Sequence, residues 1–164
     1  MAKRVAYCGM LTALAMVFSY IEVLIPFHFG VPGIKLGLAN LVVLTGIYYM
    51  RPLEVLVISV MRILLVGFMF GNGMSILYSL AGGLLSLGVM LLLSKIQAFS
   101  KVGVSIAGGV THNIGQLLVA MLVVRTTHLV YYLPVLIFAG VVTGFLIGIV
   151  SDRMTAVWKQ APRG

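Results

Sequence analysis

Residues 104–124, VSIAGGVTHNIGQLLVAMLVV, form a stretch without charged residues that predicts a membrane-spanning helix. A helix of about 20 apolar residues is long enough to cross the hydrocarbon core of a bilayer. Within this stretch, His112, Asn113 and Gln116 place an imidazole and two carboxamides where polar groups are costly. Because they are three or four residues apart, we expect them to point roughly the same way and to line a site.

The composition extends this interpretation to the whole chain. Of the 164 residues, 62% are hydrophobic and only 9% are charged, whereas apolar residues make up about half of a soluble domain. We therefore expect an all-α integral membrane protein, with residues 1–164 forming a single transmembrane domain and a six-transmembrane-helix bundle. The predicted helices cover residues 5–25, 34–50, 53–70, 74–94, 104–124 and 131–151.

The basic residues account for the net charge of +8 without a nucleic-acid partner. They are scattered between apolar spans and do not form a basic stripe with interleaved aromatic residues. With a cytoplasmic N-terminus, most of them fall at cytoplasmic helix ends, as the positive-inside rule expects. These residues are Lys3, Arg4, Arg51, Lys95, Lys101, Arg153, Lys159 and Arg163. We therefore predict that both termini are cytoplasmic.

Three basic residues depart from this pattern. Arg62 falls near the middle of its span, where a guanidinium is costly unless it is paired or hydrated. It either pairs with Glu22 or with backbone carbonyls, or it contacts a ligand. Lys35 and Arg125 fall near the outer boundary, where long side chains commonly reach the headgroups. Together, the three would give an outward-facing cavity a positive lining that attracts an anionic or strongly polar ligand.

The polar residues of the opening stretch have an alternative role. Hydrogen bonds from His112, Asn113 or Gln116 to neighbouring helices would hold the bundle together, each contributing about 0.6 kcal/mol on average. A single polar residue would favour that role. Three on one face, with glycines beside them, favour contact with a ligand.

Catalytic and metal chemistry are not expected. The acids are limited to Glu22, Glu54 and Asp152, which are too far apart in sequence to form paired carboxylates or an aspartate-rich magnesium motif. A phosphate-binding loop for ATP is also missing. With one cysteine, Cys8, and no His, Cys, Asp and Glu set at metal-ligand spacing, we predict no disulfide, no metal site and no cofactor.

Small residues recur at intervals of four along several predicted helices. In lipid, such stripes let helix backbones approach closely, and packing replaces the hydrophobic driving force. For the later helices, including the one with Gly140, Gly144 and Gly148, we expect packing inside the bundle. For the first helix, with Gly9 and Ala13, docking of another protein is nearly as well supported.

Three stretches resemble the Gx transporter family, whose members are often labelled heptaprenyl diphosphate synthase component I. They are PGIKLGLAN at residues 32–40, FGNGMSILYSLAGGLLS at residues 70–86, and HNIGQ at residues 112–116. The family is similar to the substrate-binding S components of energy-coupling-factor transporters. This resemblance implies an S-component-like bundle in a bacterial cytoplasmic membrane, with a ligand pocket under the outer loops.

The resemblance also implies partners. S components assemble with a membrane T subunit and two ATPase subunits through small residues of the first helix. Here those residues would be Ala6, Gly9 and Ala13, although the usual Ala-x-x-x-Ala pattern reads Gly9-x-x-x-Ala13.

The leading hypothesis is a non-enzymatic transporter subunit that captures a small-molecule or lipid-like ligand. The predicted pocket consists of Lys35, Asn40, Arg62, Asn72, Tyr78, His112, Asn113, Gln116 and Arg125. The first alternative is a non-catalytic membrane accessory component of heptaprenyl diphosphate synthesis, and the second is a structural membrane scaffold. Since prenyl diphosphate synthases are similar to one another in aspartate-rich magnesium sites, catalysis by this chain alone is not expected.

Overall fold

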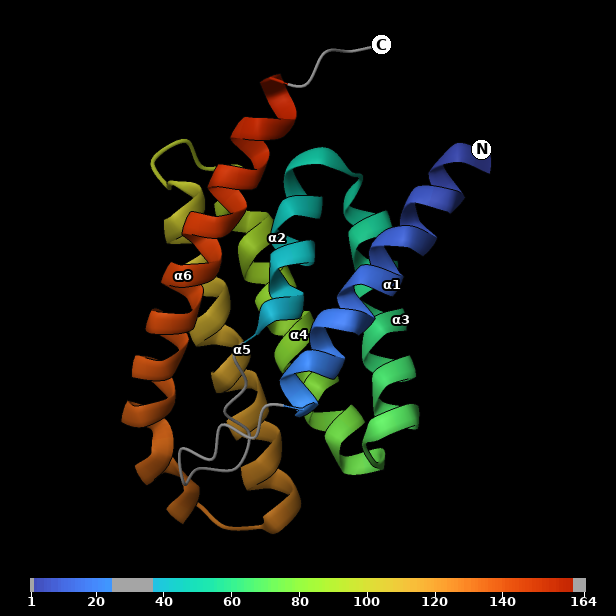
Figure 1. Ribbon diagram of the computed structural model, residues 1–164. Helices are drawn as coiled ribbons and strands as arrows, with labels where there is room; N and C mark the ends of the chain where they lie inside the picture. Colours follow the sequence, from blue (N-terminus) through green and yellow to red (C-terminus); the bar gives the residue numbers. More distant parts are fainter. Residues whose placement is uncertain (1, 25–36, 161–164) are drawn as a thin grey trace.

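The computed structural model describes residues 2–24 and 37–160. In these ranges the chain forms α-helices and one short 3-10 helix (Figure 1), which confirms the prediction of an all-helical protein. The elements are α1 (Ala2–Leu24), α2 (Leu38–Tyr49), α3 (Pro52–Phe70), α4 (Gly73–Leu93), α5 (Lys101–Val124), η1 (His128–Tyr132) and α6 (Leu133–Gln160).

Five of the described helices are long and apolar enough to cross a membrane, and α2 is not. With 12 residues, α2 is roughly 18 Å long at 1.5 Å per residue, against a hydrocarbon core about 30 Å thick. The prediction of a full span over residues 34–50 is therefore wrong for α2. The helix begins after Gly37, whose φ of 72° is a left-handed conformation that does not continue a helix.

Local signals in the sequence explain where α3 and α4 begin. Pro52 opens α3 at a position where its missing N–H costs no hydrogen bond. The carboxylate of Glu54 accepts a hydrogen bond from the backbone N–H of Arg51 at 3.0 Å. At the start of α4, the Oδ1 atom of Asn72 accepts from the backbone N–H of Ser75 at 2.8 Å. These caps fix where the two helices begin.

The helices form an arc around α2 (Figure 1). Helix α4 lies between α3 and α5, α5 packs along α6, and α1 packs against α3. Helix α2 contacts α1, α3, α4 and α6, and its Leu44 is fully buried together with Val55 of α3 and Val104 of α5. Helix α1 begins and α6 ends at the same end of the bundle, called here the terminal end.

Glycines bring α5 and α6 into backbone contact. A Cβ atom placed on Gly144 would lie 2.7 Å from the Cα of Ile106, and one on Gly140 would lie 2.9 Å from the carbonyl oxygen of Gly109. Gly148 makes a similar approach one turn further along α6. Since real Cβ atoms do not come so close, these positions require glycine. This confirms that the small residues of α6 serve packing inside the bundle.

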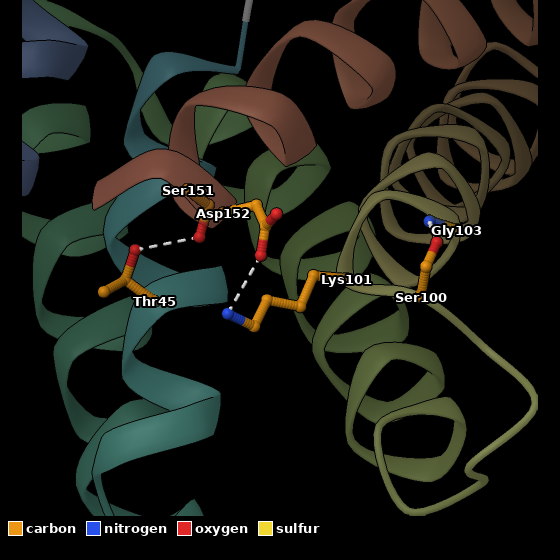
Figure 2. A network of polar contacts seen from close by, with 6 residues as sticks. All are labelled: Thr45, Ser100, Lys101, Gly103, Ser151 and Asp152. Carbon is orange, nitrogen blue, oxygen red and sulfur yellow. Dashed lines mark hydrogen bonds and ion pairs between the residues drawn. The ribbon is translucent and has the colours of Figure 1, made fainter. Parts of the chain in front are cut away.

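Polar contacts join α2, α5 and α6 at the terminal end (Figure 2). The hydroxyl oxygens of Thr45 and Ser151 lie 3.1 Å apart, and Ser151 is fully buried. The Nζ atom of Lys101 lies 3.1 Å from Oδ1 of Asp152. Lys101 lies at the start of α5, where the helix dipole disfavours a positive charge. The negative charge of the Asp152 carboxylate offsets this unfavourable interaction.

Candidate functional site

Arg62 of α3 is the ionised side chain that lies deepest along a described helix. It stands roughly 12–15 Å from either end of α3 at 1.5 Å per residue. Its Nη1 donates a hydrogen bond to the hydroxyl of Ser19 on α1 at 3.2 Å, and Ser19 is buried. Its Nε atom is also buried and has no hydrogen-bond partner among the described residues. The guanidinium therefore has donors in reserve for an anion.

Glu22 lies one turn beyond Ser19 on α1. It exerts the attractive electrostatic effect on Arg62, and its carboxylate accepts a hydrogen bond from the backbone N–H of Leu38 at the start of α2. The structure thus brings Arg62 and Glu22 into one polar region between α1, α2 and α3. The two roles predicted for Arg62, pairing with Glu22 and binding a ligand, are both compatible with this geometry.

The polar residues of α5 divide between two helix interfaces. The Nδ2 atom of Asn113 donates to the backbone carbonyl of Leu136 on α6 at 2.8 Å, and both residues are buried. The other two lie against α4. A Cβ placed on Gly82 would lie 2.8 Å from Cγ of Gln116 and 2.6 Å from the carbonyl oxygen of His112. The expectation that all three form one wall is therefore wrong in its geometry, and their binding roles stay predictions.

The remaining predicted pocket residues belong to several different elements. Lys35 lies outside the described residues. Asn40 lines a very small cavity between α2, α4, α5 and α6. Asn72 caps α4 and is exposed, and Arg125 ends α5 in a left-handed conformation, also exposed. Tyr78 is half-buried on α4. The binding roles of these residues stay predictions.

The predicted docking residues of α1 are exposed. Ala6, Gly9 and Ala13 all lie on accessible helix surface, and a Cβ added to Gly9 would meet no described atom within 4 Å. Gly9 differs in this respect from Gly140 and Gly144, which the bundle itself uses for close packing. The surface of α1 that carries these small residues is therefore available to a partner or to lipid.

A groove that the sequence analysis missed opens at the terminal end, between α1, α2 and the start of α3. Its volume is about 650 Å³, and its lining is mostly apolar. Tyr7, Tyr48 and Tyr49 contribute aromatic side chains, and Arg51 and Glu54 lie at its polar end. Tyrosines near the ends of membrane helices are a signal that could have pointed to it, because these side chains favour the interface between lipid and water.

Each of the three acids has a structural partner, and they lie in different places. Glu22 accepts from Leu38, Glu54 accepts from Arg51 at the start of α3, and Asp152 pairs with Lys101. In the described ranges, no group of three or more His, Cys, Asp or Glu side chains is placed to hold a metal ion. The described acids therefore do not form a paired-carboxylate site.

A family model described as heptaprenyl diphosphate synthase component I matches residues 11–154. No curated protein matches the chain, and no solved structure does. The matched range extends from the middle of α1 to α6, so it includes Arg62, the polar residues of α5 and the lining of the groove at the terminal end apart from Tyr7.

Proposed function

Because this chain belongs to the heptaprenyl diphosphate synthase component I family, we propose that it is the membrane-embedded accessory component of heptaprenyl diphosphate synthesis. The observation that carries this proposal is the family match over residues 11–154 of 164, nearly the whole chain. In this role, the protein holds a catalytic partner or its prenyl product at the membrane. The chain's five membrane-length helices suit that task.

The family is the non-catalytic component, so the chemistry belongs to another subunit. Synthesis of a prenyl diphosphate needs magnesium held by carboxylates. With only three acids, each already in contact with a backbone amide or a lysine, this chain is poorly equipped to supply them. The family description implies a component II, which we assign as the catalytic partner.

We assign the docking of that partner to the small-residue surface of α1, defined by Ala6, Gly9 and Ala13. This surface is exposed, and nothing in the described bundle packs against Gly9. Small residues allow a partner's helix or loop to approach the backbone closely. A partner that docked here would leave the interior of the bundle undisturbed.

The terminal end is assigned to the cytoplasm, where a soluble synthase would meet it. Among the described basic side chains, Arg51, Lys95, Lys101 and Arg153 belong to this end, and Arg125 belongs to the opposite end. The positive-inside rule supports this orientation. Labelling of single cysteines introduced at the two ends, with a membrane-impermeant reagent on intact cells, would test it.

The proposal is tested by co-purification and by product analysis. The tagged chain, expressed with the catalytic prenyl diphosphate synthase subunit, should retain that subunit through gentle detergent extraction. Membranes that contain the chain should also raise the yield of long-chain product over membranes without it. Absence of both effects would contradict the proposal.

A second candidate is a ligand-binding subunit of an energy-coupling-factor-type transporter. The observation that favours it is the buried Nε of Arg62, a donor without a partner in the described ranges and well placed for an anionic ligand. In that case, membrane T and ATPase subunits would co-purify in place of a prenyltransferase. Recovery of neither partner, with no bound ligand, would favour a structural scaffold.

A further inference from the structure

The groove at the terminal end changes in polarity along its length. It follows α2 from Val42 to Tyr49, roughly 10 Å at 1.5 Å per residue, and continues to Arg51 beyond the end of the helix. Val42 and Leu11 provide an apolar lining deep in the bundle. Tyr49 and Arg51 lie at the other extreme, where α2 ends and α3 begins, and both are exposed. An occupant must therefore have an apolar part and a polar end that remains at the membrane surface.

The Arg51 side chain can hold an anion at the polar end. The guanidinium of Arg51 can make two parallel hydrogen bonds to a phosphate. Helix α3 begins at Pro52, so the positive end of its dipole lies at the same place. Glu54 also lines the groove, but its carboxylate accepts the backbone N–H of Arg51 and caps α3. Lys101, whose Nζ lies 5.5 Å from the ring centroid of Tyr48, is paired with Asp152 at 3.1 Å and therefore adds no net charge there.

The apolar part favours a single chain. The groove has a volume of about 650 Å³, enough for the first units of a chain, and the remainder would lie in the surrounding lipid. Since the roughly 10 Å that the groove follows along α2 is about a third of a hydrocarbon core about 30 Å thick, the groove cannot enclose a long chain completely. An amphiphile with one chain and a strongly anionic end fits these dimensions better than a lipid with two chains.

We propose that this groove binds the diphosphate end of a polyprenyl diphosphate, with the phosphates at Arg51 and the first isoprene units between Leu11 and Val42. This inference rests on the proposed function, because it makes the protein the receiver of the partner's product. The diphosphate remains at the surface of the membrane, and the chain enters the bilayer alongside α1 and α2. The groove recognises the head of the product and not its length.

The test uses the full chain reconstituted in nanodiscs and measures binding of farnesyl diphosphate. Farnesyl diphosphate should bind saturably, whereas farnesol and inorganic pyrophosphate, which each lack one half of the recognised structure, should bind far more weakly. Geranylgeranyl diphosphate should bind about as well as farnesyl diphosphate. Phosphatidylglycerol in excess should not displace the probe. Displacement by this lipid would identify a general lipid groove and overturn the proposal, as would absence of saturable binding.

Two pairs of variants locate the site. Arg51→Gln should weaken binding of farnesyl diphosphate roughly tenfold or more, the effect of losing a charge-assisted hydrogen bond. Arg153→Gln removes an equally exposed arginine from the same end and should leave binding unchanged. Leu11→Trp should fill the groove and reduce binding, whereas Leu14→Trp, on the exposed surface of the same helix, should not. Equal losses in both members of a pair would overturn the assignment.

The outcomes separate this inference from the proposed function. If component II co-purifies with the chain but farnesyl diphosphate does not bind, the groove assignment fails alone. If farnesyl diphosphate binds and Arg51→Gln weakens it, but no prenyltransferase associates, the accessory role fails and the site stands. Size-exclusion profiles of all four variants, matched to that of the unmodified chain, establish that each one is folded.

Discussion

Nη1 of Arg62 lies 3.2 Å from the hydroxyl of Ser19, so a hydrogen bond from a permanent cation joins α3 to α1 in the middle of the bundle. Glu22 acts on the same guanidinium from one turn further along α1. These contacts place the one deeply set arginine at the interface between the helix proposed to dock a partner and the helix that begins at the groove.

Replacing Ser19 with alanine should lower the stability of the bundle by about 1–3 kcal/mol, because a buried donor of Arg62 then loses its acceptor. Thermal unfolding in detergent would measure the change. Ser79→Ala, at a half-buried serine of α4, is the control. Equal stability of the two variants would mean that water or lipid replaces Ser19 without cost.

Gly144→Ala should destabilise the protein by about 1–3 kcal/mol through overpacking. The added Cβ would lie 2.7 Å from the Cα of Ile106, and a backbone atom cannot move aside cheaply. Gly88→Ala, at a position where a Cβ meets no described atom within 4 Å, should be neutral or stabilising by up to about 1 kcal/mol. Unfolding in detergent compares the two. A neutral Gly144→Ala would contradict the close packing of α5 and α6.

Gly9→Leu should block association with the catalytic partner without altering the fold. A leucine on the exposed surface of α1 adds bulk where a partner would approach, and it touches no other helix of the bundle. Gly88→Leu is the matched control, because Gly88 is equally exposed on α4. Co-purification is the measurement. Full retention of the partner by Gly9→Leu would move the docking site away from α1.

Asp152→Asn should cost less than about 1 kcal/mol at low salt, since the carboxylate is 59% exposed and its pair with Lys101 is screened by solvent. The difference from the unmodified chain should shrink as ionic strength rises. Thermal unfolding at two salt concentrations would measure both effects. A large loss that is independent of salt would mean that the pair is an essential part of the fold.

The bounds of α3 and α4 were predictable to within about a residue, because tight turns around Arg51-Pro52 and Gly71-Asn72 separate long apolar runs. The span assigned to α2 was wrong. Hydropathy measures how apolar a stretch is and does not register the left-handed backbone of Gly37, after which the helix begins.

The site was less predictable than the helices. The sequence shows three polar residues close together in α5, but their spacing could not tell which neighbouring helix each one faces. Asn113 and His112 are consecutive and therefore about 100° apart around the helix, which directs Asn113 to α6 and leaves His112 against α4. The groove escaped prediction because its lining comes from three helices, and no single stretch of sequence contains it.

The backbone contact between Gly144 and Ile106 also has a mechanical meaning. Two helices packed at this distance cannot slide or tilt separately without a steric clash, so we expect α5 and α6 to move as one rigid unit. Movement is then easier on the other side of the bundle, where a Cβ added to Gly9 of α1 would meet no described atom within 4 Å. When a partner pulls on this protein, we expect α1 to yield first, and the groove beside it should widen or narrow with that movement.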